Sequence, residues 1–306
     1  MSVWVCGEVL VDRLGESNTV GGGPANTARA IARLGQEVEF IGGISTDEFG
    51  VRANEEFARD QVGMHHVHRS NKPTASASVS VDAKGQATYQ FTTSGTVTFD
   101  FALDWLPDPY RHKPSALHIG TLATIVEPGA SVLFEWATRV CEFAPIIFDP
   151  NVRSQVLSDR EKYLSIFERW ASISTVIKAS AEDLDWLYPN QSIVEVASRL
   201  LDYGIQLVVV TQGAQGITAI TRAENVVIGA VASEVVDTVG AGDTVGAVLV
   251  DSILRNGILN LQGAKLQEAL NCAVHAAAIT CSRAGAQPPT RSEIDAAIER
   301  SENAVH

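Results

Sequence analysis

The segment VVDTVGAGDTVGAVLV, residues 235–250, places an aspartate, Asp243, directly after Gly240-Ala241-Gly242 and before an apolar stretch of helical character. The first backbone N–H groups of a helix lack partners within the helix and favour negative charge. Glycines let an anion such as phosphate approach the backbone closely. The amides of Gly240, Ala241 and Gly242 can therefore form an anion hole, and Asp243 can accept a proton from an attacking hydroxyl. The alternative is a plain helix start with Asp243 as its N-terminal cap.

Two better-known phosphate motifs are absent from the sequence. No segment matches GxxxxGK[ST], which excludes a P-loop NTPase. The spacing from Gly240 through Gly242 to Gly246 misses GxGxxG by one residue, and TVGGGPAN after the first expected strand lacks the third glycine. The sequence therefore disfavours a dinucleotide-dependent dehydrogenase.

A glycine-rich segment near the N-terminus, GGGPAN at residues 21–26, precedes a helical pattern. The bare backbone of Gly22 and Gly23 and the amide of Asn26 can contact the hydroxyls of a polar ligand. The alternative is a glycine loop in which Pro24 sets the helix entry. Asp12, just after the first strand, can accept hydrogen bonds from paired hydroxyls, or it is an aspartate of a surface turn.

Two further polar groups follow expected strands. DPNVR contains Asn151 and Arg153, and the planar guanidinium of an arginine fits a phosphate group. The alternative for Arg153 is a surface side chain after a turn. KASAED contains Ser180 and Asp183, whose carboxylate can organise waters around Mg²⁺. The alternative for this segment is a helix cap with acidic residues in the first turn.

Other side chains with metal-binding or redox chemistry lack a supporting pattern. HHVH, residues 65–68, follows Gly63 with no cysteine nearby, and we interpret it as a solvated segment rather than a metal site. The four cysteines form no CxxC pair and lie in or beside apolar segments, so we expect them to be reduced and mostly buried.

Composition restricts the class of protein. The chain has 306 residues, of which 45% are hydrophobic, and a formal net charge of −13, which argues against a nucleic-acid-binding surface. The N-terminal sequence lacks the basic start of a secretory signal, and no apolar run is long enough to span a bilayer. We therefore expect a cytoplasmic protein without a membrane segment.

Apolar strand patterns alternate with helical patterns along most of the chain, which predicts an α/β fold with a mainly parallel sheet and helices on both faces. In such sheets ligands bind at the carboxyl ends of the strands. The segments DPN, KAS, TQGAQG and DTVGAGD are expected at those ends. The expected strands are 2–12 (broken at Gly7 and Glu8), 37–45, 116–120, 145–153, 175–180 and 206–216, and the expected helices are 27–35, 47–63, 130–143, 159–172, 181–188 and 193–204.

The segment 74–99 has a different pattern, with two alternating stretches around the turn DAKG that predict a β-hairpin. Composition alone favours an extension of the sheet edge over a lid.

Taken together, these motifs resemble the ribokinase-like (PfkB) carbohydrate kinases along nearly the whole chain. GGGPANTARAIARLG is similar to the first signature of that family, and DTVGAGDTVGAVLV is similar to the second. The resemblance implies a ribokinase-like fold as one kinase domain over residues 1–306. It implies a β-sheet lid formed by about 10–20 and 74–101, in place of the edge extension. It also implies ATP-dependent phosphorylation of a sugar hydroxyl.

The resemblance implies a role for each matched residue. Asp243 becomes the general base, and the amides of Gly240–Gly242 stabilise the transferring phosphoryl group. Asp183 would hold Mg²⁺ through water. The candidate sugar ligands are Asp12, Gly22, Gly23, Asn26, Asn151 and Arg153. The candidate ATP ligands are Ser180, Thr211, Gly213, Gly216 and Asn271. The candidate ligands of a monovalent cation such as K⁺ are Asp237, Val239 and Gly285.

Within the family, the segments GEVLVD, HIGTLAT, DPNVR and KASAEDLDWL are most similar to fructokinases. The expected activity is therefore ketohexose phosphorylation. The alternatives are a kinase for ribose, a nucleoside or 2-keto-3-deoxygluconate, and a sugar-binding regulator without catalysis. The expected partner is a small sugar, and lid strands with free edges would allow a homodimer.

Overall fold

The computed structural model describes residues 1–14, 17–81 and 87–304. Its main sheet has nine strands, and every neighbouring pair is parallel except the two pairs that involve β12. In spatial order the strands are β13 (Asn225–Ile228), β12 (Ile217–Ile220), β11 (Leu207–Thr211), β10 (Val176–Ser180), β9 (Ile146–Asp149), β8 (Ala116–Gly120), β1 (Val3–Cys6), β4 (Val38–Ser45) and β5 (Val67–Ser70).

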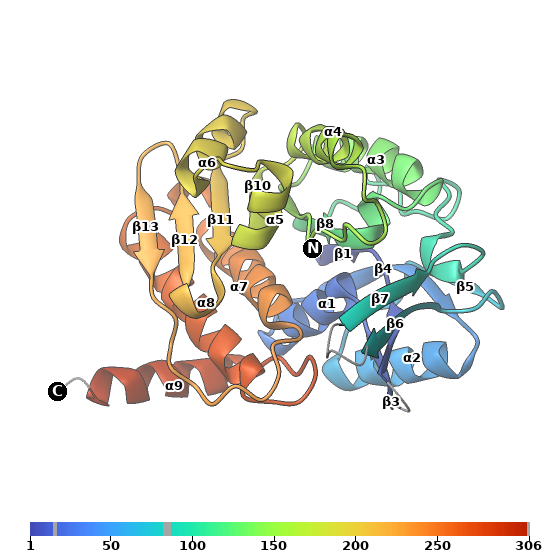
Figure 1. Ribbon diagram of the computed structural model, residues 1–306, viewed down its shortest axis with the longest axis horizontal. Helices are drawn as coiled ribbons and strands as arrows, with labels where there is room; N and C mark the ends of the chain where they lie inside the picture. Colours follow the sequence, from blue (N-terminus) through green and yellow to red (C-terminus); the bar gives the residue numbers. More distant parts are fainter. Residues whose placement is uncertain (15–16, 82–86, 305–306) are drawn as a thin grey trace.

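Helices cover both faces of this sheet, as the sequence predicted. Figure 1 shows α3 and α4 on one side of the central strands and α1 on the other. The first layer contains α3 (Gly129–Val140), α4 (Arg160–Ala171), α5 (Ala181–Leu187) and α6 (Ile193–Asp202). The second contains α1 (Gly23–Arg33), α2 (Glu48–Asp60), α7 (Ala241–Asn256), α8 (Ala264–Cys281) and α9 (Arg291–Ala304). Four single 3₁₀ turns are η1 (Val97–Phe99), η2 (Thr121–Thr124), η3 (Gly213–Gln215) and η4 (Ile258–Asn260).

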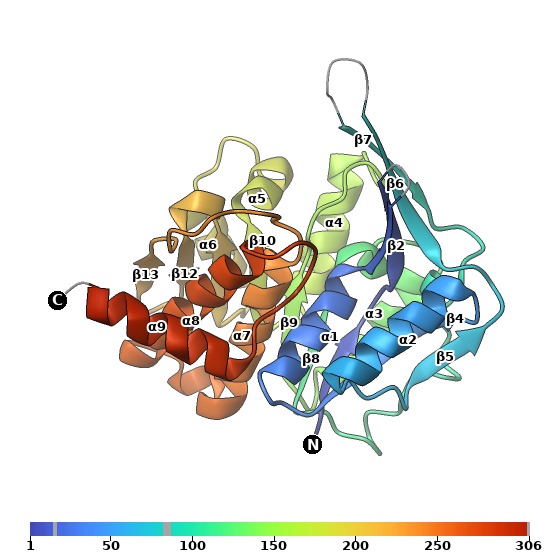
Figure 2. The same ribbon diagram turned by 90° about the horizontal axis from the view of Figure 1, so that it is seen from below.

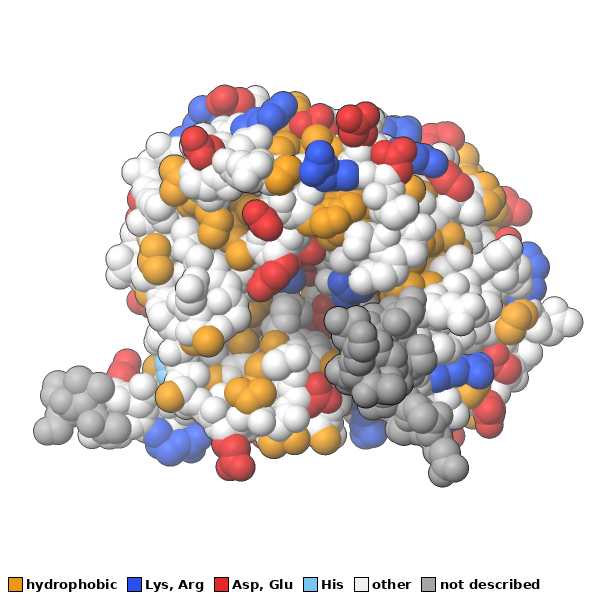
Figure 3. Space-filling model, viewed as in Figure 1, with side chains coloured by type: hydrophobic (Ala, Val, Ile, Leu, Met, Phe, Trp, Pro, Cys, Tyr) orange, Lys and Arg blue, Asp and Glu red, His pale blue; other side chains and the backbone are white. Residues whose placement is uncertain are grey.

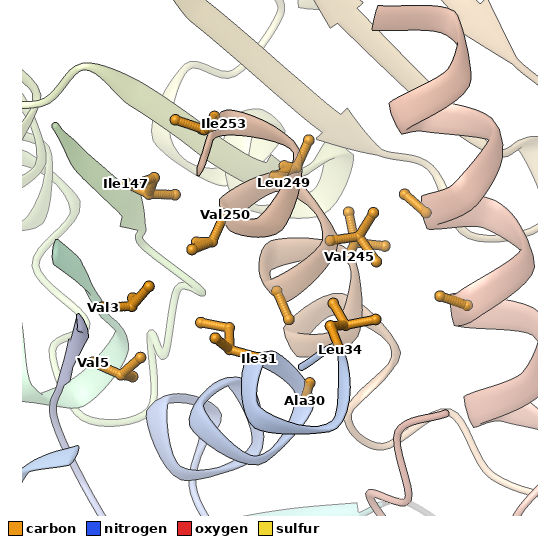
Figure 4. Close-up of a cluster of buried hydrophobic side chains, with 14 of the residues drawn as sticks. Val3, Val5, Ala30, Ile31, Leu34, Ile147, Val245, Leu249, Val250 and Ile253 are labelled. Carbon is orange, nitrogen blue, oxygen red and sulfur yellow. The ribbon is translucent and has the colours of Figure 1, made fainter. Parts of the chain in front are cut away.

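The alternation of the central strands explains this layering. Along β1, Val3 and Val5 enter the core under α1 and α7, whereas Trp4 enters the core under α3 and α4. Successive side chains of a strand point to opposite faces, so an apolar strand without polar alternation must be covered on both. Figure 4 shows Val3, Val5 and Ile31 pointing toward one another on the α1–α7 side. Because α1 and α7 share this core, their N-terminal ends are held side by side.

A second sheet of four strands is separate from the main one. It has the order β3 (Ser17–Gly21), β2 (Leu10–Leu14), β6 (Ala75–Val81) and β7 (Ala87–Thr92), and β2 and β6 are parallel. The strands β6 and β7 are antiparallel, which confirms the predicted hairpin, while its turn lies outside the described residues. Figure 2 shows these two strands projecting away from the helices at one side of the molecule.

Several expected boundaries were wrong. The expected strand 2–12 breaks at Gly7, where φ is 153°, as predicted, but its second part is β2 of the smaller sheet, which begins at Leu10. The helix expected at 27–35 already begins at Gly23, with Pro24 in its first turn. No strand precedes the glycine turn at 240–242, since residues 229–240 are irregular. The strands β5, β12 and β13 were not predicted.

The cysteines were expected to be reduced and mostly buried, and the HHVH segment to be solvated; the structure agrees only in part. All four cysteines are free, but Cys141 is exposed, contrary to its expected burial. HHVH is not simply a solvated turn, because its last residues enter β5. His65 is exposed beside Glu39, and His68 stacks on Trp105. Within the described ranges, no cluster of His, Cys, Asp and Glu side chains suits a metal ion, and none of the helices is both long and apolar enough to cross a membrane.

Candidate active site

The carboxyl ends of adjacent parallel strands bring the predicted polar segments together. In register, Gly120 of β8 lies opposite Asp149 of β9, and Ser180 of β10 lies opposite Thr211 of β11. Figure 3 shows a hollow in the middle of this face, with acidic and basic side chains on its walls. The N-terminal ends of α1 and α7 complete the site from the second helical layer.

The turn before α7 has a backbone that requires glycine. Gly240 has φ 81°, and a Cβ on it would lie 2.7 Å from the Cβ of Ala286. The Gly240 carbonyl accepts the Thr244 amide at 2.9 Å, so Gly240 precedes the helix and Asp243 is its third residue. The side chain of Asp243 therefore does not cap the helix, and that alternative is wrong. Ala241 and Gly242 begin the helix, where backbone N–H groups are unpartnered within it.

Asp243 is a buried carboxylate with one amide partner. The residue is 8% exposed, and Asn26 donates a hydrogen bond from Nδ2 to Asp243 Oδ2 at 2.8 Å. Burial raises the pKa of Asp243 to about 6, although the positive charge of Lys178 and the Asn26 hydrogen bond both lower it. A carboxyl group with such a pKa is ionised at neutral pH yet basic enough to accept a proton.

The second oxygen of Asp243 faces a space that a side chain on Gly23 would fill. A Cβ on Gly23 would lie 3.2 Å from Asp243 Oδ1, 2.9 Å from Thr121 Cγ2 and 3.4 Å from Asn151 Nδ2. The structure therefore brings Gly23, Asn26 and Asn151 together around Asp243, as the sequence predicted. Thr121 was not predicted, although the quoted HIGTLAT segment contains it.

Asp12 and Arg153 lie at the edge of this group. Asp12 on β2 is half-buried, and its Oδ2 would lie 2.8 Å from a Cβ on Gly21. Burial raises the pKa of Asp12, and the nearby positive charge of Arg153 opposes that rise. Arg153 is half-buried and donates from Nη1 to the carbonyls of Asn151 and Val152 at 3.2 and 3.0 Å. Arg153 is therefore not a free surface arginine. Its guanidinium lies near the carboxyl groups of Glu8, Asp12 and Asp243.

A buried ion pair below the site was missed. Lys178 donates from Nζ to Asp149 Oδ2 at 2.6 Å, and the two residues are 4% and 1% exposed. Burial alone lowers the pKa of an ammonium, but the Asp149 carboxylate outweighs it, and the pKa of Lys178 is raised. The available signal was a lysine inside the apolar strand VIKAS of a parallel sheet, where a charge must have a partner.

Glu8 and His118 were also missed. Glu8 is buried, accepts hydrogen bonds from the Thr121 hydroxyl and the Ala123 amide, and burial raises its pKa to about 7. His118 is buried on β8, where burial and the charge of Lys178 lower its pKa to about 3. Glu8 fixes η2, which carries Thr121, and His118 lies against Gly246 in the second turn of α7.

The expected nucleotide residues form a group on β10 and β11. Ser180 and Thr211 are neighbours across the two strands, and Gly213 and Gly216 shape the following turn with φ of 53° and 98°. Asn271 is half-buried on α8, which packs against β12 and β13. Contacts among the described residues do not connect the Asn271 side chain with the other members of this group.

Asp183 makes the helix cap that the sequence left open as an alternative. Its Oδ1 accepts the Val152 amide at 2.7 Å and its Oδ2 accepts the Ser180 amide at 2.9 Å. The Ser180 hydroxyl in turn accepts the Asp183 amide at 3.0 Å. Asp183 therefore joins the loop after β9 to the start of α5.

The three residues predicted for a monovalent cation lie together. Asp237 accepts the Val239 amide at Oδ1, at 3.0 Å, and the Gly285 amide at Oδ2, at 2.9 Å. These contacts fix the loop before α7 to the loop after α8.

Known proteins that resemble this chain are carbohydrate kinases. The description "pfkB family carbohydrate kinase" matches residues 8–293. A fructokinase of Rhizobium leguminosarum bv. trifolii is 33% identical over 263 residues, which cover 83% of this chain and 80% of that protein.

Two solved structures share the whole fold. The fructokinase of Xylella fastidiosa with bound ATP is 25% identical to this chain and has a TM-score of 0.91. The match covers 98% of this chain and 99% of that one. A double mutant of the Vibrio cholerae O395 fructokinase, bound to fructose, ADP and potassium ion, is 27% identical with a TM-score of 0.85, over 97% and 98% of the two chains. The predicted ribokinase-like fold is confirmed. The family match over nearly the whole chain, together with these relatives, shows that the protein belongs to the pfkB family and is an ATP-dependent carbohydrate kinase.

Proposed function

We propose that this protein is a fructokinase-type kinase that transfers the γ-phosphate of ATP to a hydroxyl of a ketohexose, with Asp243 as the general base. The observation that carries the proposal is the position of Asp243 Oδ1 beside the space over Gly23, at the start of α7. The fructokinase names of its relatives and the fructose-bound neighbour support the choice of sugar.

The reaction begins with the sugar hydroxyl hydrogen-bonded to Asp243. Asn26 holds one carboxylate oxygen, so the other oxygen is directed at the hydroxyl in the space over Gly23. As the hydroxyl oxygen bonds to the γ-phosphorus, its proton passes to Asp243, and the bond from the γ-phosphorus to the bridging β-phosphate oxygen breaks to release ADP. The amides of Gly240, Ala241 and Gly242 stabilise the charge on the transferring phosphoryl group. The Ala241 amide donates to the Thr238 carbonyl at 3.3 Å and would turn from it toward the phosphoryl group.

The remaining polar residues around this space orient the sugar. Asp12 accepts hydrogen bonds from hydroxyls, and Asn26, Asn151 and the backbone at Gly22 and Gly23 contact others. Arg153 balances the negative charge of the surrounding carboxylates and contacts the sugar or the transferred phosphate. Closure of the four-stranded sheet over the sugar would exclude water, which otherwise competes as the acceptor.

ATP would lie along the ends of β10 and β11, against Ser180, Thr211, the Gly213–Gly216 turn and Asn271. Mg²⁺ that accompanies ATP offsets the charge of its phosphates. Asp183 fits an indirect role toward this ion, since each oxygen already accepts one backbone amide and keeps a lone pair for water. The carboxylate of Asp237 and the carbonyls near Val239 and Gly285 are the oxygen donors that a K⁺ ion takes.

The test is ADP formation from ATP and Mg²⁺ with D-fructose, ribose, a nucleoside and 2-keto-3-deoxygluconate as separate acceptors. We expect D-fructose to give the highest kcat/KM. Turnover with another acceptor would contradict the choice of sugar but keep the chemistry. Binding of a sugar without turnover of any acceptor would contradict catalysis and favour a sugar-binding regulator.

A further inference from the structure

The buried pair of Lys178 and Asp149 lies directly under the turn that precedes α7. A Cβ on Gly242 would lie 3.1 Å from Lys178 Nζ, so the ammonium occupies the space beside this glycine. An ammonium has three N–H donors, and the single hydrogen bond found for Lys178 among the described residues goes to Asp149. Asp149 Oδ1 is likewise buried without a hydrogen-bond partner in the described part of the chain.

Such a pair is poorly explained by stability alone. Moving both charges out of water is costly, and well-packed apolar residues of similar volume are often at least as stable as a buried ion pair. On the same face of the sheet, Val176 and the cross-strand neighbour Val209 are apolar and fully buried, so an apolar residue at position 178 would suit the strand. The Lys178 ammonium lies next to Gly242 and near Asp243, so a role in the active site would explain why the buried ion pair is present.

We propose that Lys178 is a positioning residue: its ammonium, held by Asp149, supports the Gly240–Gly242 turn and keeps Asp243 in the ionised form that a general base needs. The inference rests on the proposed function and adds to it a residue that the family resemblance did not supply. A methyl group on Gly242 would press on the ammonium, because its Cβ would lie 3.1 Å from Lys178 Nζ.

The charges around Asp243 agree with this role. Lys178 on β10 and Arg153 after β9 favour its ionised form, whereas Asp149 on β9 disfavours it. Glu8, before β2, is buried beside Thr121, and the His118 ring on β8 is held neutral by burial and by Lys178. Lys178 is the largest favourable charge, so its removal raises the pKa of Asp243.

The experiment is a pH profile of kcat for Lys178→Met, an uncharged side chain of similar length. We expect kcat at the pH optimum to fall by about 10- to 100-fold, since the anion site loses a positive charge. We expect the acid limb of the profile to move up by about one pH unit. KM for the sugar should stay within about threefold, and Lys178→Arg should restore the limb toward its wild-type position.

The double variant Lys178→Met/Asp149→Asn covers the case in which the single variant does not fold, since it leaves no unpaired buried charge. It should fold and still have a lowered kcat. The matched control is Arg291→Met/Asp251→Asn, which removes another partly buried ion pair, at the far end of α7. The control should lose stability without moving the pH limb.

An unchanged kcat and pH limb in folded Lys178→Met would overturn the inference, and so would a loss confined to the KM of the sugar. Asp243→Asn separates this failure from that of the proposed function. If Asp243→Asn is inactive and Lys178→Met is normal, only the role of Lys178 fails. If Asp243→Asn is fully active, both fail.

Discussion

Two aspartates occupy similar places in this molecule and have different surroundings. Asp183 is the third residue of α5, and Asp243 is the third residue of α7. Both are 8% exposed, so burial does not separate them. Both oxygens of Asp183 accept backbone amides, whereas Asp243 accepts one side-chain amide and directs its other oxygen at the space over Gly23. The number and kind of hydrogen-bond partners, rather than burial, therefore distinguish the structural carboxylate from the candidate base.

The largest effect is expected from Asp243→Asn. An amide cannot accept the proton of the sugar hydroxyl, so kcat should fall by at least about 1000-fold. The Kd for the sugar, measured by calorimetry, should change by less than about threefold, because Asn26 and the other contacts remain. A variant with near wild-type turnover would remove Asp243 from its role.

A second large effect is expected from Gly23→Ala. The added methyl group would lie 2.9 Å from Thr121 Cγ2 and 3.2 Å from Asp243 Oδ1, in the space assigned to the sugar. KM for the sugar should rise by about 10- to 100-fold, with a smaller change in KM for ATP. Gly35→Ala is the control, because Gly35 lies away from the site at the end of α1, where an added Cβ would meet no atom within 4 Å. Its positive φ of 86° adds backbone strain that Gly23 lacks, so the control also covers a general loss of stability. Equal effects of the two variants on KM for the sugar would contradict the assignment.

The pH dependence of turnover follows from the raised pKa of Asp243. The base must be ionised, so kcat/KM for the sugar should be constant above the pKa of Asp243 and half-maximal near pH 6, because this profile reports the enzyme without bound sugar. Below that pH, kcat/KM should fall by about tenfold per pH unit. The limb is measured with the sugar well below its KM. A limb near pH 4 would contradict the raised pKa of the base.

Asp183→Asn tests whether Asp183 has the structural role that its two backbone hydrogen bonds indicate. The amide group of an asparagine cannot accept a backbone amide on both sides, so one buried donor loses its partner. We expect the free energy of unfolding to fall by about 1–3 kcal/mol, measured by denaturant titration. In the folded variant, kcat should fall by about tenfold with a raised requirement for Mg²⁺. An unchanged stability would show that these capping contacts do not hold α5.

The smallest effect is expected from Asp237→Asn, in the loop before α7. The K⁺ concentration for half-maximal activity should rise by about tenfold, while kcat at saturating K⁺ stays within about twofold. Turnover is measured in potassium and in tetramethylammonium salts. The absence of any K⁺ dependence in the wild-type protein would contradict the cation site.

The sequence predicted the features that depend on local pattern. Gly240 and Gly242 predicted the start of a helix, and the alternation of strands and helices predicted the parallel sheet. The small sheet was less predictable, because β2 pairs with β6 across more than 60 residues, and no local signal encodes that pairing. The break at Gly7 was predicted, but for the same reason the sequence did not show that the segments on its two sides join different sheets.

Candidate site residues were predictable where the residue type and its motif together indicate a chemical role. Asp243, Asn26 and Gly23 were given roles from their motifs, whereas Lys178, Glu8 and Thr121 lie in quoted segments and were given none. Lys178 is a charge inside an apolar strand, and only the fold places its partner Asp149 on the neighbouring strand. The alternative uses of Asp183 and Asp243 could not be separated from sequence, because both follow the pattern of an acidic residue in the first turn of a helix.

The most direct test of the comparison is the ratio of kcat for Asp243→Asn to kcat for Asp183→Asn, with saturating D-fructose and ATP and Mg²⁺. Both variants are corrected for their folded fraction, so that loss of stability does not count as loss of chemistry. The account predicts that the Asp243 variant is slower by about 100-fold or more. Equal turnover numbers, or a slower Asp183 variant, would contradict the assignment of Asp243 as the base.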